Sequence, residues 1–404
     1  PQSSRPEELA QRPETKAHIR YIEPGPARWC SLSRSEPVSA KRRDLQSPAP
    51  RPNYQRSEAV LPATRGQPVR RSADTGGTPA GAIKAVKLLI SENTSLILGP
   101  LLSDEVKSIA PLARQSGINI VAFSTDPTVA GEGVYLLGHT SRQQLIRLIK
   151  FAYDSGLRKF AILAPRTPYG YSVVNQMRLA IRIVGGTFHK FAFYAADGSD
   201  SDEVIKQFAN YESRKRKLTE ERAVLRTKND ELSKQALLGL DGLDTMGKVG
   251  FDTLLIADGG QRLSQIVALL PYYDIDPDKV KFVGTGLWDT PEKIRDATLI
   301  GSWYVSSPPE ARTDFVKRFK RLYGYVPHHI ATLGYDATAL AASLARSYNA
   351  LEFGKEALTN ERGFLGADGI FRFSDDGLTE RGLAILEILE NGKTKIVDPA
   401  PDRF

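Results

Sequence analysis

The chain has little cysteine and no long apolar run, and each absence excludes a class of protein. Cys30 is the single cysteine among 404 residues, which excludes an internal disulfide and a cysteine-based metal cluster. No stretch approaches the roughly 18 consecutive apolar residues of a membrane-spanning helix. The five histidines include the neighbours His328 and His329, whose side chains diverge, and they show no metal-ligand spacing. We therefore expect no metal and no cofactor.

Motifs of catalysis are also missing. The sequence holds neither a Gly-x-Ser-x-Gly nucleophile elbow nor a phosphate-binding loop. Asp74-Thr-Gly occurs once and no apolar strand precedes it, whereas an aspartic protease needs two such triplets, or a dimer, to bring two carboxylates together. We therefore predict a protein that is not an enzyme.

The positive charge is concentrated at one end. Residues 1–73 hold 14 basic and 7 acidic side chains, whereas residues 74–404 hold 41 basic and 40 acidic ones. A nucleic-acid-binding domain needs a basic face on its folded part, so we expect no nucleic-acid partner. Residues 1–73 also carry 11 of the 25 prolines, and we predict that they form a disordered Pro/Arg-rich leader. Its arginines indicate either an electrostatic tether to nucleic acid or anionic lipid, or simply a solvated leader that is foreign to the domain.

From Asp74 onward the sequence predicts an α/β fold, because short apolar runs alternate with amphipathic segments. Such alternation favours parallel sheets covered on both faces. Asn391-Gly392 predicts a hairpin between the last two strands. The expected strands are 95–98, 119–123, 134–137, 159–164, 187–194, 252–256, 280–284, 302–306, 369–373, 384–389 and 393–397, and the expected helices are 79–92, 103–116, 141–155, 170–184, 261–270, 310–323 and 331–351.

The segment 202–238 differs from the rest because it is highly charged and has a seven-residue apolar repeat. The repeat consists of Val204, Tyr211, Leu218, Leu225 and Leu232. So narrow a stripe predicts one long helix, of about 55 Å at 1.5 Å per residue. The helix lies along its own domain, or it projects as an arm that meets a protein partner.

Several motifs, taken in order, resemble one family. They are Asp74-Thr-Gly-Gly-Thr-Pro-Ala-Gly-Ala, Leu96-Ile-Leu-Gly-Pro-Leu, Val121-Ala-Phe-Ser-Thr-Asp, Phe160-Ala-Ile-Leu-Ala-Pro-Arg-Thr-Pro-Tyr-Gly, Asp252-Thr-Leu-Leu-Ile-Ala-Asp-Gly-Gly, Gly334-Tyr-Asp-Ala and Gly366-Ala-Asp-Gly-Ile-Phe-Arg-Phe. Over about 74–398 the series resembles type I periplasmic binding proteins of the leucine-binding kind. It is most similar to the branch called penicillin-binding protein activators in alphaproteobacteria.

The resemblance implies two Rossmann-like lobes. Lobe one would comprise 74–139 and 306–371, and lobe two would comprise 140–305 and 372–404, with the long charged helix in lobe two. Crossovers would lie near Gly138–Thr140, Ser306–Pro308 and Phe371–Ser374. The first lobe would lack its first strand-helix-strand unit, because Arg70-Arg71-Ser72-Ala73 does not read as a buried strand. We likewise expect that this sequence carries no signal or lipoprotein leader, and that any membrane attachment would need a lipid anchor outside it.

Ligands of parallel α/β sheets bind beyond the carboxyl ends of the strands, where loops and helix N-termini offer donors. By position, we expect Ser103, Ser124 and Thr125 to offer hydroxyls and backbone N–H groups to a ligand carboxylate, and Thr140 and Ser141 to begin the helix after the first crossover. Asp258 would accept from an ammonium group, and Trp288 would form an apolar wall. The resemblance implies that Tyr169 caps the ligand. Ser103, Thr140 and Ser141 are also explained as helix N-caps, and Asp258 with the two glycines after it as ordinary turn chemistry.

Two functions follow from the resemblance. One is an envelope interaction module that contacts and stimulates a peptidoglycan synthase. The other is a periplasmic receptor for an amino-acid-like ligand, which docks an ABC permease. The charged helix favours the first, as does the absence of the family's acidic residue near Gly286, and the hydroxyls favour the second. Both imply a periplasmic or outer-membrane-associated protein.

Overall fold

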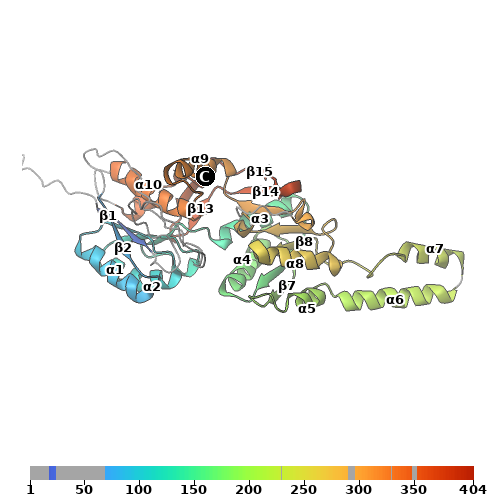
Figure 1. The fold of residues 1–404 in the computed structure, drawn as a ribbon. Coiled ribbons are helices and arrows are strands. Elements are labelled where there is room, and N and C mark those ends of the chain that lie inside the picture. Colours follow the sequence, from blue (N-terminus) through green and yellow to red (C-terminus); the bar gives the residue numbers. More distant parts are fainter. Residues whose placement is uncertain (1–17, 24–68, 229, 290–295, 329, 348–352) are drawn as a thin grey trace, which may run out of the picture. The chain divides into compact units, whose positions relative to one another are not determined.

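The computed structural model describes residues 18–23, 69–228, 230–289, 296–328, 330–347 and 353–404 (Figure 1). The chain divides into two compact units. Unit 1 comprises Pro1–Gly138, Thr313–Ala367 and Phe371–Glu380, and unit 2 comprises His139–Arg312, Asp368–Ile370 and Arg381–Phe404. Each unit is an α/β sandwich, as the sequence predicts. The predicted lobe ranges stay a prediction.

The sheet of unit 1 has five parallel strands in the order β2-β1-β3-β4-β5. Alternate residues of these strands face opposite layers of helices. Ile97 and Ile120 face a core with the helices α1 and α2, whereas Leu98 and Val121 face a core with the helix α10. The elements are β1 (His18–Glu23), β2 (Val69–Asp74), α1 (Pro79–Ser91), β3 (Leu96–Leu98), α2 (Ser103–Gln115), β4 (Asn119–Ala122), β5 (Val134–Leu136), α10 (Ala331–Ser347) and α11 (Lys355–Leu358).

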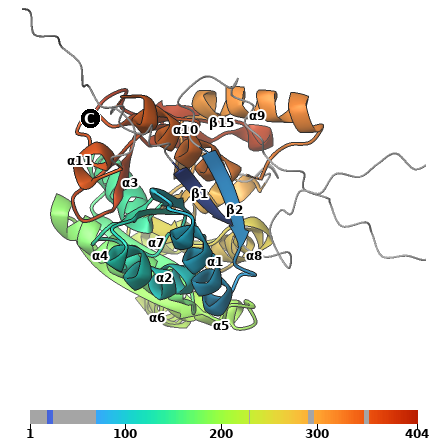
Figure 2. The same ribbon diagram turned by 90° about the vertical axis from the view of Figure 1, so that its left-hand side faces the viewer.

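The first two strands of unit 1 correct the prediction that residues 1–73 hold no strand. β1 and β2 lie side by side, with Ile19 opposite Arg70, and β1 also pairs with β3 (Figure 2). The prediction failed because β2 is an edge strand: Arg71 is exposed while Ala73 is buried. An edge strand pairs on one side only and tolerates charged side chains. The rest of the predicted leader, 1–17 and 24–68, lies outside the described residues.

The sheet of unit 2 has seven strands in the order β15-β14-β10-β9-β8-β6-β7. Five are parallel, and β14 and β15 extend the sheet in antiparallel fashion. The helices α3 and α4 cover one face and α5 and α8 the other. The elements are α3 (Ser141–Asp154), β6 (Lys159–Pro165), α4 (Pro168–Val184), β7 (Thr187–Tyr194), α5 (Ser201–Phe208), α6 (Tyr211–Lys228), α7 (Glu231–Leu240), β8 (Thr253–Ile256), α8 (Gly260–Tyr272), β9 (Lys281–Gly284), β10 (Trp303–Ser306), β14 (Ala384–Ile388) and β15 (Thr394–Asp398).

The remaining elements are short or connect these layers. The helix α9 (Pro309–Tyr323) follows β10, and a three-stranded sheet has the order β11-β12-β13. Its strands are β11 (Phe364–Gly366), β12 (Gly369–Phe373) and β13 (Thr379–Arg381), and the 3₁₀ helices are η1 (Pro127–Val129), η2 (Gly286–Trp288), η3 (Ala297–Leu299) and η4 (Glu390–Gly392).

Most predicted strands and helices are confirmed to within two residues, including the hairpin at Asn391-Gly392. The predicted helix 331–351 is described only to Ser347, because 348–352 lie outside the described residues. Ser103 is not an N-cap: Leu102 holds that position, and its N–H donates to the Glu105 carboxylate at 3.3 Å.

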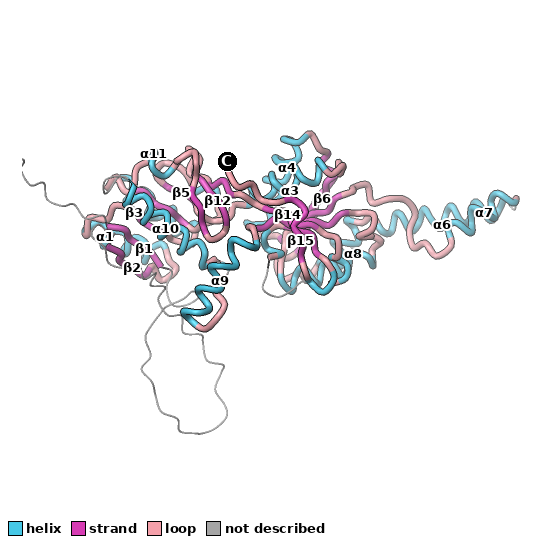
Figure 3. The backbone as a smooth tube through the Cα atoms, turned by 90° about the horizontal axis from the view of Figure 1, so that it is seen from above, coloured by secondary structure: helices cyan, strands magenta, loops and turns pink. Residues whose placement is uncertain are grey.

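The predicted single helix over 202–238 is wrong, because the segment forms three helices. Asn210 adopts a positive φ of 50° and ends the run from α5. Asp230 then caps a new helix, accepting from the Ser233 N–H at 2.8 Å. α6 and α7 form a helical hairpin (Figure 1) that projects from unit 2 (Figure 3). We call this hairpin the arm.

Candidate functional site

Two predicted residues of unit 2 lie at the carboxyl ends of its parallel strands, since Tyr169 follows β6 and Asp258 follows β8. Thr285, which is not among the candidates, follows β9. Thr167 starts α4, since its hydroxyl accepts from the Gly170 N–H at 3.2 Å. A Cβ at Gly170 would lie 1.9 Å from the Pro165 carbonyl oxygen, so glycine lets α4 start directly against the strand and positions Tyr169 there.

The Tyr169 hydroxyl lies 3.0 Å from the Thr285 hydroxyl. Burial, together with the negative charge of Asp258, raises the pKa of Tyr169 to about 12, although the hydrogen bond with Thr285 acts the other way. The phenol is therefore neutral at pH 7 and can both donate and accept hydrogen bonds.

A second polar pair centres on Asp258. Its carboxylate accepts from the Tyr194 hydroxyl at 2.8 Å and from the Gly259 N–H at 2.8 Å. Burial and the charge of Asp258 raise the pKa of Tyr194, which therefore stays a donor. A half-buried carboxylate held in this way has further lone pairs and can accept from a cationic group.

The N-terminus of α3 adds buried hydroxyls at the same edge of the sheet. Thr140 occupies the N-cap position and is 3% exposed, yet its side chain makes no capping hydrogen bond. Ser141 is also buried. Gln144 accepts from the Gly286 N–H at 2.8 Å and so ties α3 to η2.

Trp288 lies in the core of unit 2 and is 2% exposed. Its indole N–H donates to the Ile256 carbonyl at 3.3 Å, and a Cβ at Gly284 would lie 2.1 Å from its ring. The ring fixes the end of β9, and its role as an apolar wall beside a ligand stays a prediction.

The three candidates of unit 1 follow β3 and β4. Ser124 is buried and accepts from the Asp126 N–H at 3.1 Å, which shapes the turn. Thr125 is exposed, and Ser103 is the half-buried first residue of α2. The structure thus assigns Ser124 a local role, and ligand binding by these three residues stays a prediction.

Sequence reasoning missed a charged cluster in unit 2. Arg312 donates to Asp368 at 2.9 Å and to Asp289 at 2.9 Å. Ser306 donates to Asp289 at 2.7 Å, and His139 Nε2 lies 3.5 Å from the Asp368 carboxylate. Asp289 also corrects the statement that no acidic residue lies near Gly286, although its charge is already balanced by Arg312.

The charges of this cluster shift one another's pKa. Burial alone would raise the pKa of Asp368, but the hydrogen bond with His139 and the charge of Arg312 hold it well below its usual range. Burial and the charge of Arg381 lower the pKa of His139, which is therefore neutral at pH 7. We call His139, Asp289, Ser306, Arg312 and Asp368 the charged cluster.

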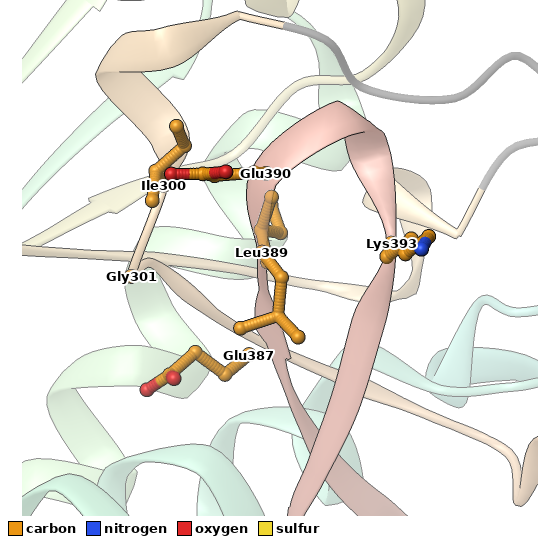
Figure 4. A pocket seen from close by; sticks show the side chains of 7 residues that line it. Ile300, Gly301, Glu387, Leu389, Glu390 and Lys393 are labelled. Atoms are coloured by element: carbon orange, nitrogen blue, oxygen red, sulfur yellow. The ribbon is translucent and has the colours of Figure 1, made fainter.

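A separate hollow of about 430 Å³ lies at the opposite edge of the unit 2 sheet (Figure 4). It is lined by Ile300 and Gly301, which precede β10, and by the turn from Glu387 to Lys393. None of the candidate residues lines it, so we do not regard it as the ligand site.

Neither a metal-ion cluster nor a membrane-spanning helix is found in the described part of the chain. No group of three or more histidine, cysteine, aspartate or glutamate side chains there could hold a metal ion, and His329 of the His328-His329 pair lies outside that part. Each described helix is too short or too polar to cross a bilayer.

Each α/β unit carries polar groups at the carboxyl ends of its parallel strands, which is where α/β sheets bind ligands. The periplasmic binding protein family matches residues 69–393, and the chain belongs to that family. The solved structures with this fold include a leucine-binding protein, which agrees with the type I periplasmic binding protein fold that the sequence indicates. The activator branch stays a prediction.

Three solved structures illustrate the similarity. A putative branched-chain amino acid ABC transporter protein of Rhodospirillum rubrum has a TM-score of 0.64 and 15% identity, over 82% of this chain and 88% of its own. A solute-binding protein of Rhodopseudomonas palustris in complex with 3,4-dihydroxybenzoic acid has a TM-score of 0.57 and 14% identity, over 83% and 86%. The leucine-binding protein LivK of Thermotoga maritima has a TM-score of 0.51 and 18% identity, over 83% and 88%.

One curated relative, a protein of Rickettsia prowazekii, is 25% identical over 135 residues. The match covers 33% of this chain and 36% of the relative, so the chain spans about a third of the length of the curated relative it matches.

Proposed function

We propose that the protein binds a small carboxylate, of the amino-acid or aromatic-acid type, in the periplasm and presents it to an ABC transporter without catalysing a reaction. The observation that carries this proposal is the pair of polar contacts at the carboxyl edge of unit 2, Tyr169 with Thr285 and Tyr194 with Asp258. The names of the solved relatives, which include leucine and 3,4-dihydroxybenzoic acid, support the ligand class.

Each group has a distinct task in this proposal. The neutral Tyr169 hydroxyl donates to a ligand oxygen, and Asp258 accepts from an ammonium group where the ligand has one. Thr140, buried and free of helix capping, and Ser141 offer donors at the positive end of α3. Within unit 1, Ser103, Ser124 and Thr125 stay candidates by their position after β3 and β4, and within unit 2 Trp288 would support η2 from the core.

Calorimetry with the amino acids and with hydroxybenzoates tests the proposal. We expect Tyr169→Phe to weaken the binding of the ligand found by about tenfold, since the loss of one hydrogen bond costs about 1.4 kcal/mol. Tyr171→Phe is the matched control, because Tyr171 lies on the same helix, is 46% exposed and packs on Phe193. Absence of binding to every compound, or an equal loss in both variants, would refute the proposal.

We also propose a second function, in which the chain contacts a peptidoglycan synthase and acts as a regulatory module of cell-wall synthesis. The arm is the observation that favours it, because a projecting helical hairpin contributes nothing to a solute site on the sheet. Replacement of residues 215–244 by Gly-Gly is expected to abolish binding to a purified synthase while leaving solute binding unchanged. Synthase binding that survives the replacement would contradict this role.

A further inference from the structure

The 3₁₀ helix η2 joins the charged cluster to the polar contact between Tyr169 and Thr285. Thr285 holds the N-cap position of η2, and Asp289 holds its C-cap position. The Trp288 N–H donates to the Thr285 carbonyl at 3.0 Å, which closes one turn between them. The Asp289 N–H donates to the Gly286 carbonyl at 3.1 Å. Because the turn is hydrogen-bonded throughout, a displacement of Asp289 also moves Thr285.

The side chain of Asp289 is held by two donors from other elements. The Ser306 hydroxyl, at the end of β10, donates to its Oδ2 at 2.7 Å, and Arg312 of α9 donates to the same oxygen at 2.9 Å. Burial acts to lower the pKa of Arg312, but the charges of Asp368 and Asp289 raise it. The guanidinium is therefore charged at pH 7, and hydrogen bonds between charged groups are about twice as strong as neutral ones.

The middle of η2 is fixed as well. Trp288 is packed in the core of unit 2, and Gln144 of α3 accepts from the Gly286 N–H at 2.8 Å. The Gln144 amide also donates to the His139 carbonyl at 3.4 Å, so it is anchored on both sides. Contacts that lie outside the candidate ligand site therefore decide where Thr285 is placed.

The place of Thr285 matters for Tyr169. The two hydroxyls lie 3.0 Å apart, although Tyr169 belongs to the first turn of α4 and Thr285 follows β9. A group that binds a ligand needs neighbours that hold it in the productive geometry. If η2 shifts, the Tyr169 hydroxyl loses this neighbour and is less well oriented to donate to a ligand.

We propose that Asp289 is a positioning residue for the candidate ligand site of unit 2. Its carboxylate is held by Arg312 and Ser306. In turn it fixes η2, so that Thr285 meets Tyr169. The inference rests on the proposed solute-binding function and gives the charged cluster a role in it. A purely structural role would let Asp289 change the stability of unit 2 without changing the surroundings of Tyr169.

The first test needs no ligand. It records fluorine NMR spectra of the full chain with a ring-fluorinated tyrosine in place of Tyr169. Thr285→Val removes the neighbouring hydroxyl and should move the fluorine resonance. Asp289→Asn keeps the shape of the side chain but removes its charge, and it should move the resonance in the same direction. Ser306→Ala alters no charge and should move it in that direction by a smaller amount.

Matched controls make the same chemical changes at other places in unit 2. Asp296→Asn alters the residue that caps η3, where Asp296 accepts from the Thr298 N–H at 2.9 Å. Ser302→Ala alters a buried serine directly before β10. Neither control should move the resonance. Circular dichroism checks that every variant is folded, and Ser306→Ala keeps the test decisive if Asp289→Asn is not.

The second test is calorimetry with L-leucine and with 3,4-dihydroxybenzoate. Asp289→Asn should weaken binding about fivefold, which is less than the loss of one whole hydrogen bond. Tyr169→Phe is expected to cost about tenfold in the unaltered chain, and in the Asp289→Asn background it should cost less than about threefold. The two changes disturb the same contact, so their effects are not additive. Asp296→Asn should leave the affinity unchanged.

Three outcomes would overturn the proposal. They are a fluorine resonance that neither Asp289→Asn nor Ser306→Ala moves, equal shifts in the two controls, and additive losses of affinity when Asp289→Asn and Tyr169→Phe are combined. If the resonance moves as expected while no compound binds, the coupling of Asp289 to Tyr169 stands and the solute-binding function alone is lost.

Discussion

Arg312→Met is expected to destabilise unit 2 severely. Arg312 is the cation that touches both Asp368 and Asp289, each at 2.9 Å. Methionine keeps most of the apolar stem but removes the charge, and Asp368 is 1% exposed. A buried carboxylate that loses its main partner costs about 3–5 kcal/mol. For a unit of about 200 residues, this corresponds to a fall in Tm of about 6–20 °C.

Differential scanning calorimetry at pH 7 measures the fall, and Arg114→Met is the matched control. Arg114 pairs with Glu132 at 2.6 Å, but the two side chains are 49% and 76% exposed, so its loss should cost at most about 1 kcal/mol. Adding Asp368→Asn to Arg312→Met should restore part of the stability, because the buried carboxylate charge that has lost its main cation is then gone. A fall no larger than that of Arg114→Met would refute the reasoning.

Three further predictions concern unit 2. His139 has a lowered pKa in the folded chain, chiefly because it is buried. Its contribution to stability is therefore present above the unfolded pKa of about 6.5 and is lost as the pH falls through that value, and His139→Gln should make the Tm less dependent on pH between pH 7 and pH 5. Gly284→Ala should cost about 1–3 kcal/mol in thermal unfolding, because the new Cβ meets the Trp288 ring, and a neutral result would contradict the packing described. Thr167→Ala should cost about 1 kcal/mol through the lost cap on Gly170, and Thr167→Ser should restore it.

The sequence predicts the layers of this fold well because its strands are buried on both faces. Ile97 and Leu98 face opposite cores, so each strand reads as a continuous apolar run that periodicity detects. Periodicity does not detect β2, because this edge strand has an exposed Arg71 and therefore no continuous apolar run. The seven-residue apolar repeat also gave no sign that the helix ends at Asn210. The repeat continues across this residue, although the positive φ of Asn210 turns the backbone.

The candidate site is predicted in part, for a different physical reason. Tyr169 and Asp258 follow strands directly, and the carboxyl ends of parallel strands meet at one edge. The charged cluster has no local signal, since Arg312 and Asp368 meet only through the folded chain. Long-range ion pairs of this kind require the topology, which local patterns do not supply.

The order of strands in unit 2 has a consequence for synthesis. β10 lies between β9 and β14, but the chain makes about 80 further residues after β10 before β14 is complete. The edge of β10 that faces β14 therefore stays open until the last part of the chain is in place. An open strand edge can pair with another chain, so the sheet of unit 2 is protected at this position only after its C-terminal strands have added.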